Sequence, residues 1–373
     1  MKIVYIVNTR MPNQRAHGFQ IAKTCEKFAA LGNDVLLLHP YRKNDVTENI
    51  FDYYGLQRNF KAETVSSIDV IVFSHIIGFL AFYLQSLLFS LVLIFKNFDN
   101  DSVIYTRDIF IAFLFQVKGH RVVYNVHNWS KKRELFSKLL NKNIKIICNS
   151  DGTKRKMIEE GFTRVIAVPN GVDTEEYNSV MDIQQVRSSL KLPVAKKIAM
   201  YVGNLYKWKG IDVILETARL VDMADILFVV VGGDIDDLKQ YTQKAAGTDN
   251  VLFVGHKQKR EIPSYIRSAD VLLLPNSAVT EESRSQTSPI KMFEYMASGV
   301  PIIASNLPSI REVLNEENSF LVEPDSPKAL AEGLKEILNN RPLAKKKAEK
   351  ALADVKKYTW DEYAKKIIQF IES

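Results

Sequence analysis

The stretch KIAMYVGNLYKWKGIDVILETARLVDMADILFVVVGG, residues 197–233, contains two apolar runs on either side of a segment that opens a helix. The first run ends at Gly203, and the second ends at Gly232 and Gly233. Short, continuously apolar strands that alternate with helices are typical of a parallel sheet covered on both faces. The stretch therefore predicts a β-α-β unit.

The same alternation extends along the chain in both directions. Strand-like runs of the first half are KIVYIV, DVLLLH, DVIVFS, SVIYT, RVVYNVH and IKIICNS, and those of the second half are KIAMYVG, ILFVVVGG, VLFVG, DVLLLPN, PIIASN and SFLVEP. Two sets of strands separated by helices predict an α/β fold with two Rossmann-like, doubly wound domains that face each other across a cleft.

The border between the two domains is marked by Pro169, Asn170 and Gly171, after which the pattern stays polar until Lys197. We predict an N-terminal domain over residues 1–172 and a C-terminal domain over 173–353. Residues 354–373 predict an amphipathic helix that packs on the body and could return to the first domain. In open α/β sheets ligands bind outside the carboxyl ends of the strands, so the loops after the strands are the expected site.

Composition is that of a globular protein with sizeable cores: 373 residues, 46% hydrophobic and 25% charged, with a net charge of +7. The charge favours an anionic partner. No zinc finger, RNA-recognition signature or basic-aromatic interleaving accompanies it, so nucleic acid is not expected. The two cysteines, Cys25 and Cys148, lie in apolar segments and are typical of reduced core residues in a cytoplasmic protein. The apolar run at the N-terminus is too short for a signal peptide and predicts a first strand.

Residues 76–95, IIGFLAFYLQSLLFSLVLIF, carry no charge over twenty positions, which is long enough to span a bilayer. If DVIVFS and SVIYT belong to one sheet, a single crossing would separate them, so a buried crossover helix is the alternative. Nearby are six basic residues and one acid: Lys131, Lys132, Arg133, Lys138, Lys142, Lys145 and Glu134. The apolar run and the basic cluster together predict a first domain on an anionic membrane surface, peripheral on the inner face of the cell membrane.

Two loops are suited to a phosphorylated ligand. After the strand KIAMYV, Gly203 lets backbone approach closely, and Lys209 places a cation at a helix start, where it opposes the helix dipole but attracts an anion. Gly18 opens the first amphipathic helix and could offer backbone N–H groups. His127 follows RVVYNV at the carboxyl end of a strand; such a histidine is either structural or functional.

The stretch SQTSPIKMFEYMASGVP, residues 285–301, predicts a short helix with Ser288 as its N-cap, Pro289 at its first position and Gly299 at its end. Glu294 lies at the edge of the apolar stripe of this helix and needs a partner. An ion pair with Lys291 and a bound ligand are both open. Asp234-Ile235-Asp236 has a spacing found in metal-dependent sugar transferases, but it more simply caps the next helix. The chain lacks GxGxxG, which disfavours a nicotinamide enzyme.

In order along the chain, RAHGFQIAKTCEKFAALGNDV, YNVHN, VPNGVD, YVGNLYKWKG and SPIKMFEYMASGVPIIAS resemble the retaining glycosyltransferases of family 4, which have the GT-B fold and use a nucleotide sugar. The resemblance covers nearly the whole chain. It implies that Glu294 binds the donor ribose, Lys209 the diphosphate and His127 the transferred sugar. Backbone near Gln286, Ser288, Ile290 and Lys291, and Gly18 from the first domain, would approach the donor. It also implies a metal-independent reaction without a cofactor.

Two positions depart from the pattern of that family. Gln286 stands where many members have a glutamate that touches the transferred sugar, and Asn204 stands where they have arginine after the loop glycine. Glu281, Glu282 or Arg284 could substitute for the first, and Lys291 could join Lys209 in place of the second. The sequence thus predicts a retaining hexosyltransferase acting on a lipid-linked or polysaccharide acceptor. A nucleotide-sugar 2-epimerase and a non-catalytic nucleotide-sugar or membrane-binding scaffold are the alternatives.

Overall fold

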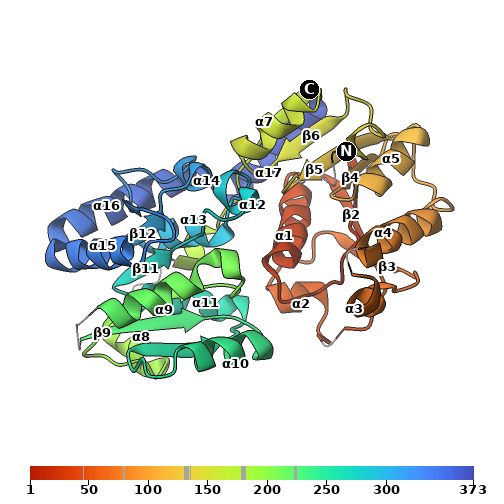
Figure 1. Cartoon of the computed structure of the whole chain (residues 1–373). Helices are drawn as coiled ribbons and strands as arrows, with labels where there is room; N and C mark the ends of the chain where they lie inside the picture. The colour runs from red at the N-terminus through yellow and green to blue at the C-terminus, as the bar shows by residue number, and fades with distance from the viewer. Residues whose placement is uncertain (45, 79, 130–133, 135, 178–181, 222–224) are drawn as a thin grey trace. The chain divides into compact units, whose positions relative to one another are not determined.

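The computed structural model describes residues 1–373 except 45, 79, 130–133, 135, 178–181 and 222–224 (Figure 1). It divides into two compact units: unit 1 comprises Met1–Pro169 and Trp360–Ser373, and unit 2 comprises Asn170–Thr359. These borders differ by a few residues from those expected at 172 and 353. The last helix belongs to unit 1.

Unit 1 is built on a parallel sheet of seven strands in the order β3-β2-β1-β4-β5-β6-β7. The elements are β1 Lys2–Ile6, α1 Ala16–Ala30, β2 Asp34–Pro40, α2 Ile50–Tyr54, β3 Lys61–Val65, η1 Ile71–Phe73, α3 Ser74–Ile77, α4 Leu80–Leu93, β4 Val103–Thr106, α5 Ile109–Val117, β5 Arg121–Val126, β6 Lys145–Cys148, α7 Asp151–Glu159, β7 Arg164–Ala167 and α17 Trp360–Glu372.

Both faces of this sheet are covered. On one face, Ile6 and Ile104 pack with Phe89 of α4 and Phe115 of α5 in a single apolar core. On the other, the Phe28 ring of α1 lies 5.6 Å from that of Tyr105. Helix α17 closes this second face. Its Trp360 ring lies 6.2 Å from that of Phe19, and its Asp361 forms an ion pair of 3.0 Å with Lys27.

One predicted strand of unit 1 is wrong. Residues 69–74, DVIVFS, contain the short 3-10 helix η1, and Val72 and Phe73 are more than half exposed. The third strand is instead β3, KAETV, an edge strand with a single buried residue, Val65. A polar edge strand lacks the apolar pattern that marks the central strands, so sequence reasoning passed over it. The edge strand β7 was also absent from the expected set.

Unit 2 is built on a six-stranded parallel sheet in the order β10-β9-β8-β11-β12-β13, and all six strands were predicted. Its elements are η2 Thr174–Tyr177, α8 Ile183–Ser189, β8 Lys197–Val202, η3 Lys207–Lys209, α9 Ile211–Leu220, β9 Ile226–Val231, α10 Ile235–Lys244, β10 Val251–Gly255, η4 Lys259–Glu261, α11 Ile262–Arg267, β11 Val271–Leu274, α12 Glu281–Ser285, α13 Ile290–Ser298, β12 Ile302–Ser305, α14 Pro308–Arg311, β13 Phe320–Val322, α15 Pro327–Asn339, α16 Arg341–Asp354 and η5 Val355–Lys357.

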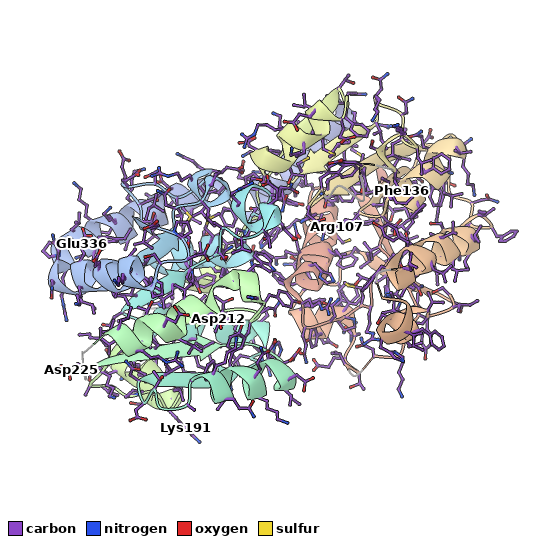
Figure 2. All side chains as sticks on the ribbon, viewed as in Figure 1. Arg107, Phe136, Lys191, Asp212, Asp225 and Glu336 are labelled. Atoms are coloured by element: carbon purple, nitrogen blue, oxygen red, sulfur yellow. The ribbon has the colours of Figure 1, made fainter. Side chains whose placement is uncertain are left out.

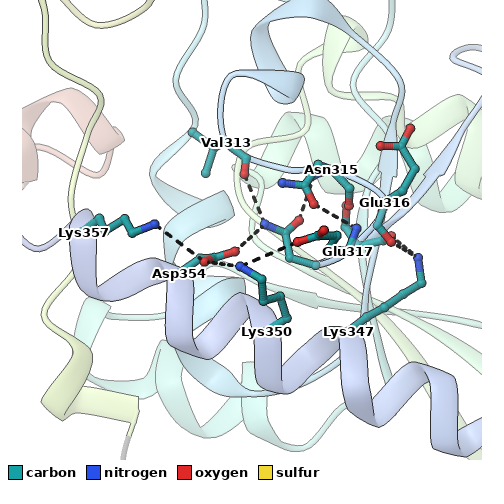
Figure 3. A network of polar contacts seen from close by, with 10 residues as sticks. Val313, Asn315, Glu316, Glu317, Lys347, Lys350, Asp354 and Lys357 are labelled. Carbon is teal, nitrogen blue, oxygen red and sulfur yellow. Dashed lines mark hydrogen bonds and ion pairs between the residues drawn. The ribbon is translucent and has the colours of Figure 1, made fainter.

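Alternating residues of β8 serve two cores. Met200 packs with α11 and α13, while Tyr201 packs with α9 and α15. Figure 3 shows the contacts of Asp354 at the end of α16. One carboxylate oxygen accepts from Lys350 of the same helix over 2.6 Å. The other accepts from the Asn318 side chain over 3.2 Å, which ties α16 to the segment before β13. Polar contacts therefore anchor α16 beside the apolar core.

Each sheet has one place where the strand order reverses direction. In unit 1 the chain runs outward from β1 to β3 and then resumes with β4 on the other side of β1; in unit 2 the reversal lies between β8 and β11. Loops that follow strands at such a switch point diverge and leave a crevice, where ligands of open α/β sheets bind. The candidate sites are therefore the loops after β1 and β4 and those after β8 and β11.

Candidate functional site

The loop after β8 is shaped by three glycines. Gly203 has φ +136°, and a Cβ on it would lie 2.8 Å from the Nζ of Lys291. A Cβ on Gly232, after β9, would lie 2.2 Å from the Gly203 carbonyl oxygen, and one on Gly210 would lie 1.8 Å from that of Pro275. The loop after β8 thus lies directly against its neighbours, because no side chains separate them. The space saved at Gly203 is occupied by a lysine ammonium.

Lys291 of α13 is that lysine. It is buried, and its Nζ has no hydrogen-bond partner among the described residues. The ammonium lies 3.6 Å from the centre of the Tyr201 ring. Burial and then the charge of Lys209 hold its pKa well below the usual lysine range, against an opposing effect of Glu294. A buried cation without a partner is costly, so this position favours an anionic ligand.

Lys209 ends the short helix η3, just before Gly210, which is left-handed and precedes α9. Its Nζ lies over the Trp208 ring, 3.6 Å from the centre. Burial lowers the pKa of Lys209 to about 7, with a small opposing effect of Glu282. The electrostatic effect of Lys209 on Lys291 means that the two amines act on the same region of unit 2.

Glu294 pairs with a lysine that sequence reasoning did not identify. Its carboxylate accepts from Lys259 of η4, in the segment that follows β10. The expected partner, Lys291, lies three positions before Glu294 on α13, and its Nζ makes no hydrogen bond to any described residue. The Glu294 side chain is 9% exposed. Tyr177 lies near this carboxylate. Burial, followed by the charge of Glu294, raises the pKa of the Tyr177 hydroxyl. Because a carboxylate has about four lone-pair positions, Glu294 can accept further hydrogen bonds beside the one from Lys259.

The start of α13 differs from its prediction by one residue. Pro289 is the N-cap, with extended backbone and no side-chain hydrogen bond, and Ile290 is the first helical residue. Ser288 does not cap the helix: its Oγ accepts from the Asn170 N–H over 3.1 Å, and its carbonyl accepts from the Asn170 side chain over 2.5 Å. The serine is held by the start of unit 2, which frees the helix N-terminus from a capping side chain. Gly299 ends the helix as predicted, with φ +68°.

The two positions that depart from the family pattern, and the residues that could substitute for them, are placed as follows. Gln286 is buried and ends α12. Glu281 and Arg284 form an exposed ion pair with each other on that helix. The Asn204 carbonyl accepts from the Tyr201 hydroxyl over 2.6 Å. Besides Lys209 within the loop after β8, α13 brings a second amine, Lys291, against Gly203.

The two predicted residues of unit 1 have local partners. A Cβ on Gly18 would lie 2.2 Å from the Tyr54 hydroxyl, so this glycine is required by packing within the unit. The Nε2 of His127 lies 2.7 Å from the Asn125 side-chain oxygen. The roles that the resemblance implies for Gly18 and His127 at a donor sugar stay predictions.

No group of three or more metal-ligating side chains occurs in the part of the chain that the structure describes. Asp234 is the N-cap of α10 and forms a capping box with Asp237, which confirms its structural interpretation. Asn276, in the segment after β11, is a residue that sequence reasoning missed: it is fully buried, and among the described residues neither its Nδ2 nor its Oδ1 has a hydrogen-bond partner. It lies at the switch point of unit 2, next to Ser277, whose N–H donates to the Trp208 carbonyl over 2.9 Å.

Helix α4 of unit 1 is apolar on more than its buried face. The buried face holds Phe89 and Leu93 together with Gln85, Ser86 and Ser90, whereas further leucine, valine and phenylalanine side chains are exposed. The exposed apolar residues over η1, α3, α4 and the turn after it are Val72, Phe73, Ile76, Leu80, Phe82, Leu84, Leu87, Leu91, Val92, Ile94 and Phe95. We call this set the apolar patch. Within the described residues, no helix is both long and apolar enough to cross a bilayer.

The structure describes the basic cluster only in part. Lys131, Lys132 and Arg133 lie outside the described residues. Lys145 donates to the carbonyls of Phe370 and Ile371 over 2.8 and 2.7 Å, at the end of α17. Lys145 is therefore used inside unit 1, and of the remaining members Lys138 is exposed.

Comparison with known proteins finds a family match within the second unit. Residues 182–354 match the family model of glycosyl transferases group 1. The chain is 29% identical over 236 residues to a phosphatidyl-myo-inositol mannosyltransferase of Mycobacterium tuberculosis, covering 61% of this chain and 59% of that protein. It is 23% identical over 276 residues to a D-inositol 3-phosphate glycosyltransferase of Corynebacterium urealyticum, covering 69% and 63%. The matches thus span about three fifths of these relatives.

Solved structures show the fold of the whole chain. HepE of Anabaena in complex with UDP has a TM-score of 0.76 at 17% identity, covering 100% of both chains. WaaG, a glycosyltransferase involved in lipopolysaccharide biosynthesis, has a TM-score of 0.73 at 15% identity, covering 99% of both. The chain therefore has the GT-B fold with two parallel-sheet, Rossmann-like units, as predicted.

Proposed function

We propose that the protein is a glycosyltransferase that moves a sugar from a nucleoside-diphosphate sugar to a glycan or lipid-linked acceptor, as a metal-independent, retaining hexosyltransferase. The observation that carries the proposal is the group at the switch point of unit 2. It combines a buried carboxylate, Glu294, with two amines of depressed pKa, Lys209 and Lys291. A nucleoside diphosphate has the complementary groups, since its ribose hydroxyls donate to a carboxylate and its phosphates attract ammonium groups.

Transfer requires stabilisation of the nucleoside diphosphate as it leaves. Negative charge develops on its phosphate oxygens, and preorganised cations in a water-poor site stabilise that charge most effectively. Lys209 and Lys291 supply the cations, and the N-terminus of α13, which has no capping side chain, supplies a favourable dipole. The diphosphate raises the pKa of both amines on binding, because it favours their charged forms.

The proposal is tested by a donor screen that measures nucleoside diphosphate release from UDP-, GDP- and ADP-sugars with and without a lipid-linked acceptor. We expect acceptor-dependent release with one base. Glu294→Ala should weaken binding of the matching nucleoside diphosphate at least tenfold in calorimetry, whereas Glu281→Ala, which removes an exposed carboxylate, should not. Equal affinity in both variants would remove the ribose assignment.

The same assay separates the alternatives. Conversion of a nucleotide sugar to an epimer without an acceptor would identify a 2-epimerase. Tight nucleotide binding without turnover of any donor and acceptor pair would identify a scaffold. The similarity of unit 2 to group 1 glycosyltransferases supports the transferase over both.

The apolar patch supports a second proposal, that unit 1 associates peripherally with a membrane surface. Leu84, Leu87 and Leu91 are 41%, 45% and 47% exposed and follow helical spacing along one side of α4. A helix that exposes a second apolar face beside the one it buries gains free energy when the exposed face enters the headgroup region. In vesicle flotation, Leu84→Glu with Leu91→Glu should abolish binding, whereas Ile235→Glu, at an exposed apolar residue of unit 2, should leave it unchanged. Wild-type protein that never floats would refute the proposal.

A further inference from the structure

The switch point of unit 1 carries an excess of arginine. Arg10 follows β1, Arg42 follows β2 and Arg107, labelled in Figure 2, follows β4, and these three strands are neighbours in the sheet. The charge of Arg10 acts on Arg42 and contributes to the lowering of its pKa, after burial. Three guanidinium groups thus gather at the carboxyl edge of the sheet, where loops hold ligands.

Two carboxylates share this edge, and each has partners there. Asp69 lies 3.8 Å from the Nε of Arg42. Asp108 is the N-cap of α5, where its Oδ1 accepts from two backbone N–H groups, and its Oδ2 also accepts from Ser86 and Asn8. In the described part of the chain no carboxylate lies within ion-pair distance of Arg10 or Arg107. The edge therefore keeps a positive charge that the protein does not compensate.

Arg107 is the most distinctive of the three. Its Nε donates to the Asn125 side-chain oxygen over 3.0 Å, while its Nη2 is buried and has no hydrogen-bond partner in the described structure. A buried guanidinium nitrogen that makes no hydrogen bond costs free energy unless a ligand supplies the acceptor.

Arg107 is linked to His127 through the Asn125 side chain. The Asn125 side-chain oxygen that accepts from Arg107 lies 2.7 Å from the Nε2 of His127. His17, at the start of α1, completes the surroundings: burial, followed by the charges of Arg107 and Arg15, lowers its pKa to about 4. His17 is therefore neutral at pH 7, and the positive charge of the group comes from arginine.

We propose that Arg107, held by Asn125 beside His127, binds an oxyanion of the acceptor, that is, a phosphate or carboxylate group of the molecule that receives the sugar. A guanidinium fork matches both oxyanions with two parallel hydrogen bonds, and the Nη2 of Arg107 makes no hydrogen bond to any described residue. Identifying the bound molecule as the acceptor rests on the proposed transferase function. The anion site itself rests only on residues of unit 1.

The test titrates three soluble oxyanion probes into the protein with UDP at saturation, so that the switch point of unit 2 is occupied. The probes are glucose 1-phosphate, glucuronate and farnesyl phosphate, which represent a sugar phosphate, a uronic acid and a lipid phosphate. We expect at least one to bind with one-to-one stoichiometry, and the one that binds most tightly identifies the source of the oxyanion. Methyl glucoside, which is neutral, should not bind.

Two variants connect the binding to Arg107. Arg107→Gln should weaken the best probe at least tenfold, whereas Arg58→Gln, at an exposed arginine of unit 1, should not. Asn125→Asp is nearly isosteric and places a carboxylate on the Arg107 Nε, so it should weaken the probe while the arginine stays in place. UDP affinity should change little in either variant, which excludes misfolding as the cause. Asn125→Asp should lower the unfolding temperature somewhat, because it removes the hydrogen bond from the Asn125 Nδ2 to the Ile147 carbonyl.

Absence of saturable binding by all three probes, or equal affinity in Arg107→Gln and wild type, would overturn the proposal. Displacement of the probe by UDP would also overturn it, because the oxyanion would then belong to the donor. Failure of the transferase function would appear differently: no donor turnover and no UDP affinity, with probe binding still dependent on Arg107.

Discussion

Replacing Lys291 with methionine should stabilise the ligand-free protein and weaken donor binding at the same time. Methionine has a similar length and no charge, and the site is buried, next to Gly203 and the Tyr201 ring. A buried polar group without a partner costs about 1–3 kcal/mol, so the variant should gain roughly that amount in free energy of unfolding at pH 7. A hydrogen bond to a charged group contributes about 1.5–3 kcal/mol, so affinity for the nucleoside diphosphate should fall roughly 10- to 150-fold.

The stability gain should depend on pH in a defined direction. Burial and Lys209 lower the pKa of Lys291 in the folded protein, while the unfolded chain keeps a value near 10.5. The unfolded state therefore binds more protons, and wild-type stability rises as pH increases toward 10.5. The difference between Lys291→Met and wild type should accordingly shrink over that range.

Chemical denaturation and calorimetry with the cognate nucleoside diphosphate measure both quantities. Lys239→Met, at an exposed position on α10, is the matched control and should change each by little. A less stable Lys291→Met variant with unchanged nucleotide affinity would refute the reasoning, because the lysine would then be a structural residue.

Three further outcomes are expected. Affinity for the nucleoside diphosphate should fall as pH rises above about 7, because Lys209, whose pKa burial lowers to about 7, loses its proton, and calorimetry of Lys209→Arg should show a flatter profile. Gly210→Ala should cost at least about 2 kcal/mol in denaturation, because its Cβ would lie 1.8 Å from a backbone oxygen, and Gly247→Ala, with similar φ and open space, should cost less. A double-mutant cycle on nucleotide binding with Lys259→Met and Glu294→Gln should give a coupling energy of about 0.5–3 kcal/mol, and additive effects would show that the ion pair does not position the carboxylate.

The sequence predicted the fold wherever apolar pattern and burial coincide. The six strands of unit 2 are predominantly apolar, four of them are almost wholly buried, and each was recognised. In unit 1, β3 is an exposed edge strand and gave no such pattern, whereas DVIVFS has the pattern but lies at the surface. Periodicity does not distinguish apolar residues at the surface from apolar residues in the core. The apolar patch begins at the segment DVIVFS.

The sequence predicted which residues form the candidate site, but not which lysine pairs with Glu294. Gly203, Lys209, Lys291 and Glu294 all belong to unit 2, and the first three are brought together by the loop after β8. The partner of Glu294 is Lys259, thirty-five positions away in sequence, and its position is set by the β10 strand rather than by helical spacing. The signal that could have found it is its place in the segment following a strand, since such segments converge at one edge of a parallel sheet.

Lys291 of α13 and Lys259 of η4 explain how the protein tolerates the buried charged groups of this site when no ligand is bound. Lys259 compensates Glu294, so the carboxylate is held in position before any ribose arrives. Lys291 has no such partner, and its lowered pKa reduces the cost of burial by favouring the neutral amine. A nucleoside diphosphate that brings negative charge allows Lys291 to take up a proton, and that proton uptake converts an unfavourable buried amine into a charge-assisted contact. Donor binding at neutral pH should therefore consume protons, measurable by calorimetry in buffers of different ionisation enthalpy, and uptake that persists unchanged in Lys291→Met would show that another group supplies it.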